Sequence, residues 1–339
     1  RICNHWTITE KSFPKKRISS LHGSRDYFQM EFNGFLVEVI PILKIGKAED
    51  AINITDISPL HAKWVKKNAK KMKDDIRLAK QFCKGQKIYG AESFISGFSG
   101  YVLEILVVYY GGFEKLLRAS SKWRNKQVID AEKYYKGQDA LFHLNKSKQQ
   151  SPIIVVDPVD KSRNAAAALS KEKFQLFRKK AKSYLNNPNS QYFEEKTLDL
   201  AELKNNASKR GYHFVTLEVI PLVGKEDVVG SKLLKAFNFL EKELDSFTVK
   251  KSGWEWNKKA IFYFVLEKKD LPSTKISLGP PIKMKDAVKS YKKKHKKSYV
   301  KNGRIVAEVK VKFPKLRNHV QNLLNNNYVE ERVKKISFS

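Results

Sequence analysis

The residues best suited to chemistry lie in one short stretch, VVDPVDKSRNAAAALS, residues 155 to 170. Two β-branched residues end a predicted strand, a proline stiffens its exit, and Asp157 and Asp160 bracket the turn that leads to Arg163. The alanine run after Asn164 predicts the start of a helix. An arginine held in such a turn is a group that would bind phosphate or another anion.

Two more candidates stand earlier in the chain. Glu38 lies in the predicted strand FLVEVIPIL among apolar residues, where a carboxylate could bind Mg²⁺ beside substrate phosphates or, on an edge strand, face water. Ser58 and Pro59 predict the N-cap and first residue of a helix. His61 then falls in the first turn, where it could either bind an anion or pack against Trp64.

Lys80 and Tyr89 complete the set. Lys80 stands one turn after Ile76 on the inward side of a predicted helix, where a lysine is costly unless it meets an anion or extends to solvent. The Tyr89 hydroxyl could donate to phosphate, or the ring could pack in the core. Together, an acid, a histidine, a lysine, a tyrosine and an arginine are the groups that would hold a metal-bound triphosphate for phosphoryl transfer.

Composition narrows the class of protein. The 339 residues contain 67 Lys plus Arg and 35 Asp plus Glu, a formal charge of +32, which attracts nucleic acid first and anionic membrane second. Insertion into a membrane is not expected, because the apolar run from Val102 to Tyr110 is short and contains Glu104. Two cysteines cannot form a disulfide framework, which suits the cytoplasm. Since the chain begins at Arg1, we expect a fragment or a processed product.

The pattern of predicted helices and strands that must position these residues changes along the chain. Residues 1–57 are irregular and basic before the strand at FLVEVIPIL, and helical patterns dominate residues 58–192, around a strand at IIVV. A helix is predicted after the N-cap Ser170. Residues 193–339 alternate strands and helices and include an Asn302-Gly303 turn. The predicted fold class is α+β.

Seven motifs together resemble the archaeal (class I) CCA-adding enzymes, which are tRNA nucleotidyltransferases: VEVIP, SPLHAKW, IRLAKQF, KIYGAE, GFSGY, YYGGF and VVDPVDKSRNAAAALS. The likeness runs from about Tyr27 to Leu185 and continues more weakly to about Leu324. It implies a remnant of a nucleotidyltransferase palm at 1–57, a helical neck that binds nucleotide at 58–192, and an RRM-like, tRNA-binding body with a tail at 193–339.

The resemblance also implies a function and residue roles. The family adds C, C and A to the 3′ end of tRNA from CTP and ATP, with Mg²⁺ and without a template. Glu38 occupies the position of a metal-binding, catalytic carboxylate. His61, Lys80 and Tyr89 occupy positions that bind the triphosphate, and Arg163 the position of the arginine that helps to recognise the incoming base.

The sequence departs from the family pattern at the metal site. The family has aspartate where this chain has Glu38, and the Gly-Ser signature with its following Asp-x-Asp pair, which supplies the other two metal ligands, is absent. The Gly-Ser at residues 23 and 24 has no Asp-x-Asp after it and lies too close to Glu38 to be that signature. Three interpretations follow: a CCA-adding enzyme whose N-terminal palm segment lies outside this sequence, a non-catalytic tRNA-binding relative with a decayed palm, or a related enzyme that adds poly(A) or oligoadenylate. The sequence leaves open whether the protein forms a homodimer.

A second basic feature predicts RNA binding without reference to the family. Ten Lys or Arg and one acid, Asp286, lie between Lys283 and Arg304. Such a run either only solvates a surface or contacts the phosphate backbone, and here it adds to a large positive charge. The residues expected to contact tRNA are Lys292, Lys293, Lys294, Lys296 and Lys297.

Overall fold

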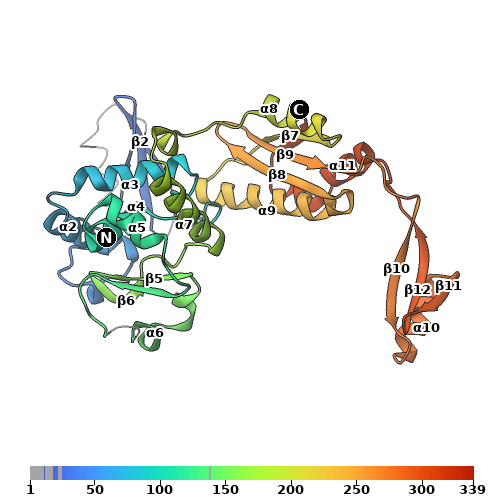
Figure 1. The fold of residues 1–339 in the computed structure, drawn as a ribbon, viewed down its shortest axis with the longest axis horizontal. Coiled ribbons are helices and arrows are strands. Elements are labelled where there is room, and N and C mark those ends of the chain that lie inside the picture. The colour runs from blue at the N-terminus through green and yellow to red at the C-terminus, as the bar shows by residue number, and fades with distance from the viewer. Residues whose placement is uncertain (1–10, 12–17, 22–24, 137–138) are drawn as a thin grey trace. The chain divides into compact units, whose positions relative to one another are not determined.

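The computed structural model describes residue 11 and residues 18–21, 25–136 and 139–339 (Figure 1). The chain divides between Lys196 and Thr197 into two compact units, here called the first and the second unit. Helices and strands occur in both units, so the expected mixture of α and β structure is confirmed. The Gly-Ser pair at residues 23 and 24 lies outside the described residues.

The first unit begins with a small antiparallel sheet in the order β1-β2-β3. Its strands are β1 (Ile18–Leu21), β2 (Tyr27–Phe32) and β3 (Phe35–Val39). Asn33 and Gly34, with φ of 51° and 78°, form the two-residue turn between β2 and β3, as expected where both turn residues need positive φ. The predicted strand at FLVEVIPIL is confirmed, but it ends at Val39, and β3 is an edge strand.

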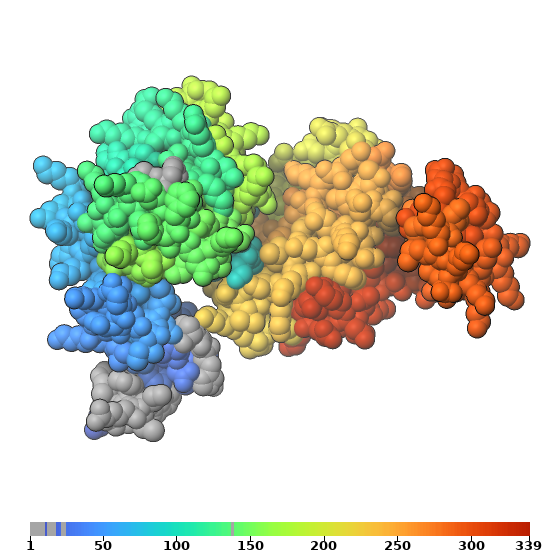
Figure 2. All heavy atoms as spheres, turned by 90° about the horizontal axis from the view of Figure 1, so that it is seen from below, coloured from blue at the N-terminus to red at the C-terminus, as the bar shows by residue number. Residues whose placement is uncertain are grey.

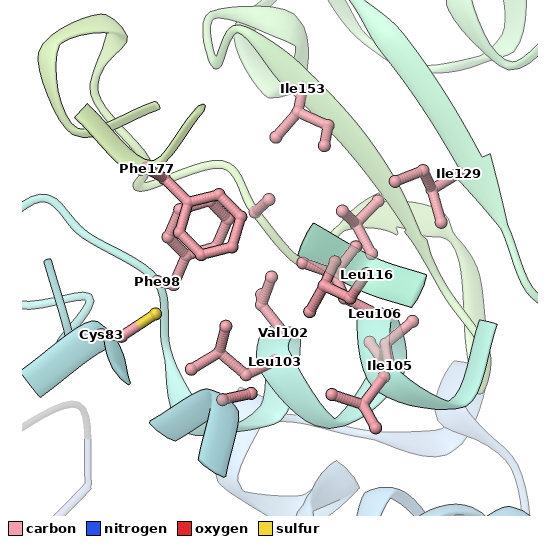
Figure 3. Packing of buried hydrophobic residues seen from close by; sticks show 14 of the residues in the cluster. Cys83, Phe98, Val102, Leu103, Ile105, Leu106, Leu116, Ile129, Ile153 and Phe177 are labelled. Atoms are coloured by element: carbon pink, nitrogen blue, oxygen red, sulfur yellow. The ribbon is translucent and has the colours of Figure 1, made fainter. Parts of the chain in front are cut away.

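Helices supply most of the core of the first unit (Figure 3). They are α2 (Ser58–Asn68), α3 (Lys73–Gly85), α4 (Gly100–Tyr110), α5 (Phe113–Ser120) and α7 (Lys171–Asn186). Helix α4 is buried on most of its surface because its sequence is almost wholly apolar. Phe98 and Phe177 pack beside it, with ring centroids 4.8 Å apart. Helix α4 is thus a fixed support on which neighbouring polar side chains can be placed.

A second sheet of the first unit has the order β4-β5-β6. Its strands are β4 (Gln127–Asp130), β5 (Ile153–Asp157) and β6 (Asp160–Asn164). The predicted helix start in the alanine run is wrong, because residues 165–168 form turns. The Asn164 side chain accepts hydrogen bonds from the Val155 and Ala166 N–H groups and holds the chain there. The helix begins at Lys171, after the predicted N-cap Ser170, whose hydroxyl accepts from Lys173 N–H.

The short elements of the first unit connect these larger ones. They are η1 (Ala48–Asp50), η2 (Ile54–Ile57), α6 (Ala140–His143), η3 (Lys146–Gln149) and η4 (Ser190–Phe193). The expected N-cap role of Ser58 is wrong, because η2 runs directly into α2 and Ser58 already has helical angles. Pro59 still lies in the first turn, as predicted.

The second unit contains an antiparallel sheet in the order β13-β7-β9-β8. The strands are β7 (His213–Ile220), β8 (Val249–Trp256), β9 (Ala260–Leu266) and β13 (Lys335–Phe338). The other elements are α8 (Leu200–Lys209), α9 (Glu226–Leu244), η5 (Asp245–Phe247), α11 (Leu316–Leu324) and α12 (Asn327–Glu330). Side chains of α9 and α11 form one core with the sheet, in which Phe237 stacks on Phe264 at 5.4 Å.

A smaller sheet completes the second unit, in the order β10-β12-β11. Its elements are β10 (Thr274–Pro281), α10 (Lys285–Lys294), β11 (Ser298–Lys301) and β12 (Arg304–Lys310), the orange atoms of Figure 2. Asn302 and Gly303 form the predicted turn, with φ of 50° and 72°. Tyr291 of α10 donates to the Ser277 carbonyl and so fixes the helix to β10. Throughout the described ranges, the helices are too short or too polar to cross a membrane.

Candidate functional site

Asp157, at the end of β5, is the centre of a buried polar cluster. His61 Nε2 lies 3.1 Å and Arg163 Nη1 lies 2.5 Å from the same oxygen, Oδ2. The other oxygen, Oδ1, accepts from the Tyr101 hydroxyl and from Val159 N–H, each at 3.0 Å. One carboxylate thus joins side chains from α2, α4 and β6.

Tyr101 and His61 also contact each other directly. Their rings stack with centroids 4.0 Å apart and an angle of 26° between the planes. The stacking fixes the plane of the His61 ring, and the bond to Asp157 fixes its rotation within that plane. His61 is therefore held in one orientation, with 15% of its side chain exposed.

Lys80 and Tyr89 meet beside Gly100, at the first residue of α4. A Cβ atom at position 100 would lie 2.9 Å from the Tyr89 hydroxyl and 3.5 Å from Lys80 Nζ. Lys80 Nζ also lies 2.6 Å from Glu104 Oε1, one turn further along α4. The side chains of Lys80 and Glu104 are 29% and 22% exposed, so Lys80 is half-buried and paired.

The two groups lie beside successive residues at the start of α4, Gly100 and Tyr101. Four of the predicted site residues, His61, Lys80, Tyr89 and Arg163, are thereby gathered around the N-terminus of α4. The N–H groups and dipole of a helix N-terminus favour an anion. Lys80 and Arg163 add N–H donors, while Glu104 and Asp157 balance their charges. The arrangement suits a ligand with several negative charges and a part that can accept hydrogen bonds from Arg163.

The electrostatics of the cluster keep Asp157 ionised. Burial alone would raise the pKa of Asp157, but hydrogen bonds from His61 and Val159 and the charge of Arg163 outweigh burial and lower this pKa below its ordinary value. Burial, followed by the charge of Asp157, raises the pKa of Tyr101. Tyr101 therefore remains a neutral hydrogen-bond donor at neutral pH.

Glu38 is not part of this cluster in the structure. It is exposed on the edge strand β3 and accepts a hydrogen bond from Gln29 Nε2 at 3.0 Å. The strand is as predicted, but the face that Glu38 shares with Leu36 is open to solvent, and Leu36 is 67% exposed. In the described part of the chain, no group of three or more His, Cys, Asp or Glu could hold a metal ion. These residues do not fit a two-metal centre.

The predicted RNA-binding lysines lie at the end of α10 and just after it. They are Lys292, Lys293, Lys294, Lys296 and Lys297. All five are exposed, and none of them forms an ion pair with an acid within the described ranges. Their charges therefore remain available to a polyanion.

The sequence did not assign a role to three residues of the cluster: Asp157, Tyr101 and Glu104. Asp157 precedes the turn that leads to Arg163, Tyr101 lies in the motif GFSGY, and Glu104 lies inside an apolar run. An acid in a segment that is otherwise buried is the signal that could have revealed Asp157 and Glu104, because such a charge needs a partner.

Comparisons with known proteins find matches in both units of the chain. A family described as tRNA nucleotidyltransferase, second domain, matches residues 74–194, and one described as CCA-adding enzyme, C-terminal domain, matches residues 215–335. A CCA-adding enzyme of Nanoarchaeum equitans is 36% identical, over 95% of this chain and 80% of the relative. CCA-adding enzymes of Methanosarcina mazei and Methanosarcina barkeri are 29% and 31% identical, over 90% and 89% of this chain and 68% and 67% of the relatives.

The two matched domains define the class, the tRNA nucleotidyltransferases, which are transferases. Within this class, the identity to named archaeal relatives over most of the chain decides the family. The chain belongs to the CCA-adding enzyme family, as the sequence motifs predicted.

Proposed function

We propose that this protein adds C, C and A to the 3′ end of tRNA, using CTP and ATP. The observation that carries the proposal is the convergence of His61, Lys80, Tyr89 and Arg163 at the N-terminus of α4, in a chain of this family. A non-catalytic tRNA-binding role is not favoured, because the relatives that match most of the chain are named for CCA addition. The cytoplasm is the expected location.

The site residues divide the work between the two ends of the nucleotide. Lys80 and Tyr89, beside Gly100, bind the triphosphate together with His61, and the N-terminus of α4 adds its dipole. Glu104 holds Lys80 Nζ in place, which lowers the entropy lost when phosphate binds. Arg163 donates one N–H to Asp157, and its remaining N–H groups donate hydrogen bonds to the edge of the base.

The second unit supplies binding to tRNA. Its main elements follow the chain order βαββαβ, namely β7, α9, β8, β9, α11 and β13. If the four strands are numbered 1 to 4 along the chain, their order in the sheet is 4-1-3-2, which supports an RRM-like body. Tyr263 lies on the face away from α9 but is only 8% exposed, so this face is not an open aromatic platform for bases. We therefore assign tRNA contact to the exposed lysines at and after α10, which would bind phosphates.

Metal chemistry is not assigned to residues of this chain beyond Glu38. Mg²⁺ would neutralise the triphosphate, and one exposed carboxylate cannot hold the two ions that this reaction class uses. The division into a palm remnant at 1–57, a neck at 58–192 and a body at 193–339 remains a proposal.

The test is extension of a tRNA that lacks its 3′ CCA, resolved nucleotide by nucleotide. We expect the 339 residues to bind this tRNA and CTP, and to add C, C and A with Mg²⁺, CTP and ATP once a palm segment with Gly-Ser and Asp-x-Asp is supplied, fused or in trans. Arg163→Ala should then impair the choice among nucleotides more than it impairs binding to tRNA. Binding to tRNA without any extension under these conditions would reject catalysis and favour the non-catalytic role.

A further inference from the structure

The Asp157 carboxylate has no capacity left for a substrate. Its side chain is fully buried, and it accepts four hydrogen bonds, from His61, Tyr101, Val159 N–H and Arg163. Two carboxylate oxygens offer about four acceptor positions, so all are in use. Asp157 can therefore act on a bound nucleotide only through the side chains that it holds.

We propose that Asp157 is a positioning residue that sets the orientation of His61 and Arg163 together and so links triphosphate binding to base recognition. The proposal rests on the proposed function, which gives His61 to the triphosphate and Arg163 to the base. Both side chains bind the same oxygen, Oδ2, and displacement of one changes the hydrogen bond available to the other.

For His61, the carboxylate selects the tautomer. An ionised carboxylate only accepts, so Nε2 must carry a hydrogen, and Nδ1 is the ring atom left for the ligand. Because phosphate oxygens also only accept, Nδ1 binds the triphosphate only when it carries a hydrogen as well, and Asp157 then balances the charge of the imidazolium. Tyr101 supports the same orientation twice, since its ring stacks on His61 and its hydroxyl donates to Asp157 Oδ1. A change at Asp157 should therefore alter the tautomer of His61 even where the fold is intact.

For Arg163, the carboxylate fixes one corner of a planar group. Binding of Nη1 at 2.5 Å holds a side chain that is 29% exposed, so its direction is set before a nucleotide arrives. A guanidinium that is positioned in advance loses less freedom on binding and discriminates better between base edges.

The primary experiment substitutes Asp157→Asn, which keeps the shape but replaces one acceptor oxygen with a donor. The readouts are the dissociation constants of CTP, ATP and UTP for the chain bound to tRNA lacking its 3′ end. We expect CTP binding to weaken about ten- to a hundredfold, as for loss of a charged hydrogen bond, and the preference for CTP over UTP to fall. In the ¹⁵N spectrum, the His61 ring should shift away from the Nε2–H tautomer.

A double-mutant cycle tests the route of the effect. If Asp157 affects base recognition only by positioning Arg163, then Asp157→Asn should change the ratio of CTP to UTP affinity little when Arg163 is already alanine. Additive losses in the ratio would reject this route.

The matched control is Asp56→Asn. Asp56 is also fully buried, pairs with Arg25 at 2.7 Å and accepts from the Leu43 N–H, and its polar partners do not belong to the cluster around Asp157. Asp56→Asn should also lower stability, because it too removes a buried carboxylate from its ion pair, but it should leave CTP affinity within about twofold. A loss of nucleotide binding equal to that of Asp157→Asn would mean that general destabilisation explains both.

Tyr101→Phe keeps the inference testable if Asp157→Asn fails to fold. It removes one hydrogen bond to Asp157 but keeps the stacked ring, and should weaken CTP binding about two- to tenfold. If the unaltered chain binds no CTP, the proposed function fails. If the unaltered chain binds CTP, and Asp157→Asn and Tyr101→Phe match it in affinity and in the CTP to UTP ratio, the positioning role of Asp157 is overturned.

Discussion

The cluster around α4 and the end of α10 use positive charge in two different ways. In the cluster, each cation is at most 29% exposed and has its own acid, Arg163 with Asp157 and Lys80 with Glu104. At the end of α10, Lys292, Lys293 and Lys294 are exposed and lack such partners within the described part of the chain.

This difference indicates that the cluster around α4 selects a particular ligand, whereas the lysines at the end of α10 attract any polyanion. A partly buried cation that an acid holds in place has a fixed direction and is screened little by salt, so it can distinguish one ligand geometry from another. An exposed lysine on a flexible stem carries no such geometric information, but its field reaches a polyanion from a distance. We therefore expect substitutions in the cluster to change nucleotide binding, and substitutions at α10 to change the salt dependence of tRNA binding.

The largest effect is expected for Lys80→Ala. Loss of a charged hydrogen bond to the triphosphate should weaken CTP binding by about 1.5 to 3 kcal/mol, roughly 10- to 150-fold, with tRNA affinity nearly unchanged. Titration with both ligands measures this. Lys73→Ala, at the exposed start of the same helix, is the control and should leave CTP affinity as it is. An unaltered CTP dissociation constant for Lys80→Ala would remove Lys80 from the site.

The next effect is expected for the triple substitution of Lys292, Lys293 and Lys294 by glutamine. The slope of log affinity for tRNA against log salt should flatten by up to about 3 units, because fewer counterions are released. CTP affinity should not change. The control substitutes three exposed lysines elsewhere in the second unit, Lys235, Lys242 and Lys258. Equal slopes for the two triple variants would mean that the charge at α10 contributes only to the general field.

A smaller effect is expected for Gly100→Ala. The added Cβ would lie 2.9 Å from the Tyr89 hydroxyl, so that side chain must move, and CTP binding should weaken about three- to tenfold. Stability should change by at most about 1 kcal/mol in either direction, because alanine is the better helix former but its Cβ displaces the Tyr89 hydroxyl. Gly46→Ala, where a Cβ would meet no atom within 4 Å, is the control. Unchanged CTP affinity would show that the position of Tyr89 is not critical.

The smallest effect concerns stability and pH. The pKa of Asp157 is lower in the folded protein than its ordinary value of 3.8, so its contribution is complete above that value. The contribution is lost as the pH falls through the folded pKa. The difference in urea midpoint between the unaltered chain and Asp157→Asn should therefore stay constant from pH 7 to about 5 and shrink below about 4. Parallel curves would mean that Asp157 is not stabilised as a carboxylate.

Local sequence signals determined the elements whose residues interact mainly with their near neighbours. Ser170 caps α7, Ile76 lies on the inward side of α3, and Asn302-Gly303 forms a turn, all as predicted. In these cases capping, helical periodicity and positive φ act over a few residues. The motifs likewise sufficed to predict the family, which the comparisons confirm.

Distant contacts decided the rest. The alanine run has high helix propensity, but the Asn164 side chain bonds to Val155 N–H on β5 and holds the run in turns. The sequence predicted a strand at β3, but only the sheet order shows that it is an edge strand on which Glu38 is exposed. The role of Asp157 depends on partners at positions 61, 101 and 163, which are up to 96 residues away. A buried charge must be paired, but the fold alone decides which side chains reach it.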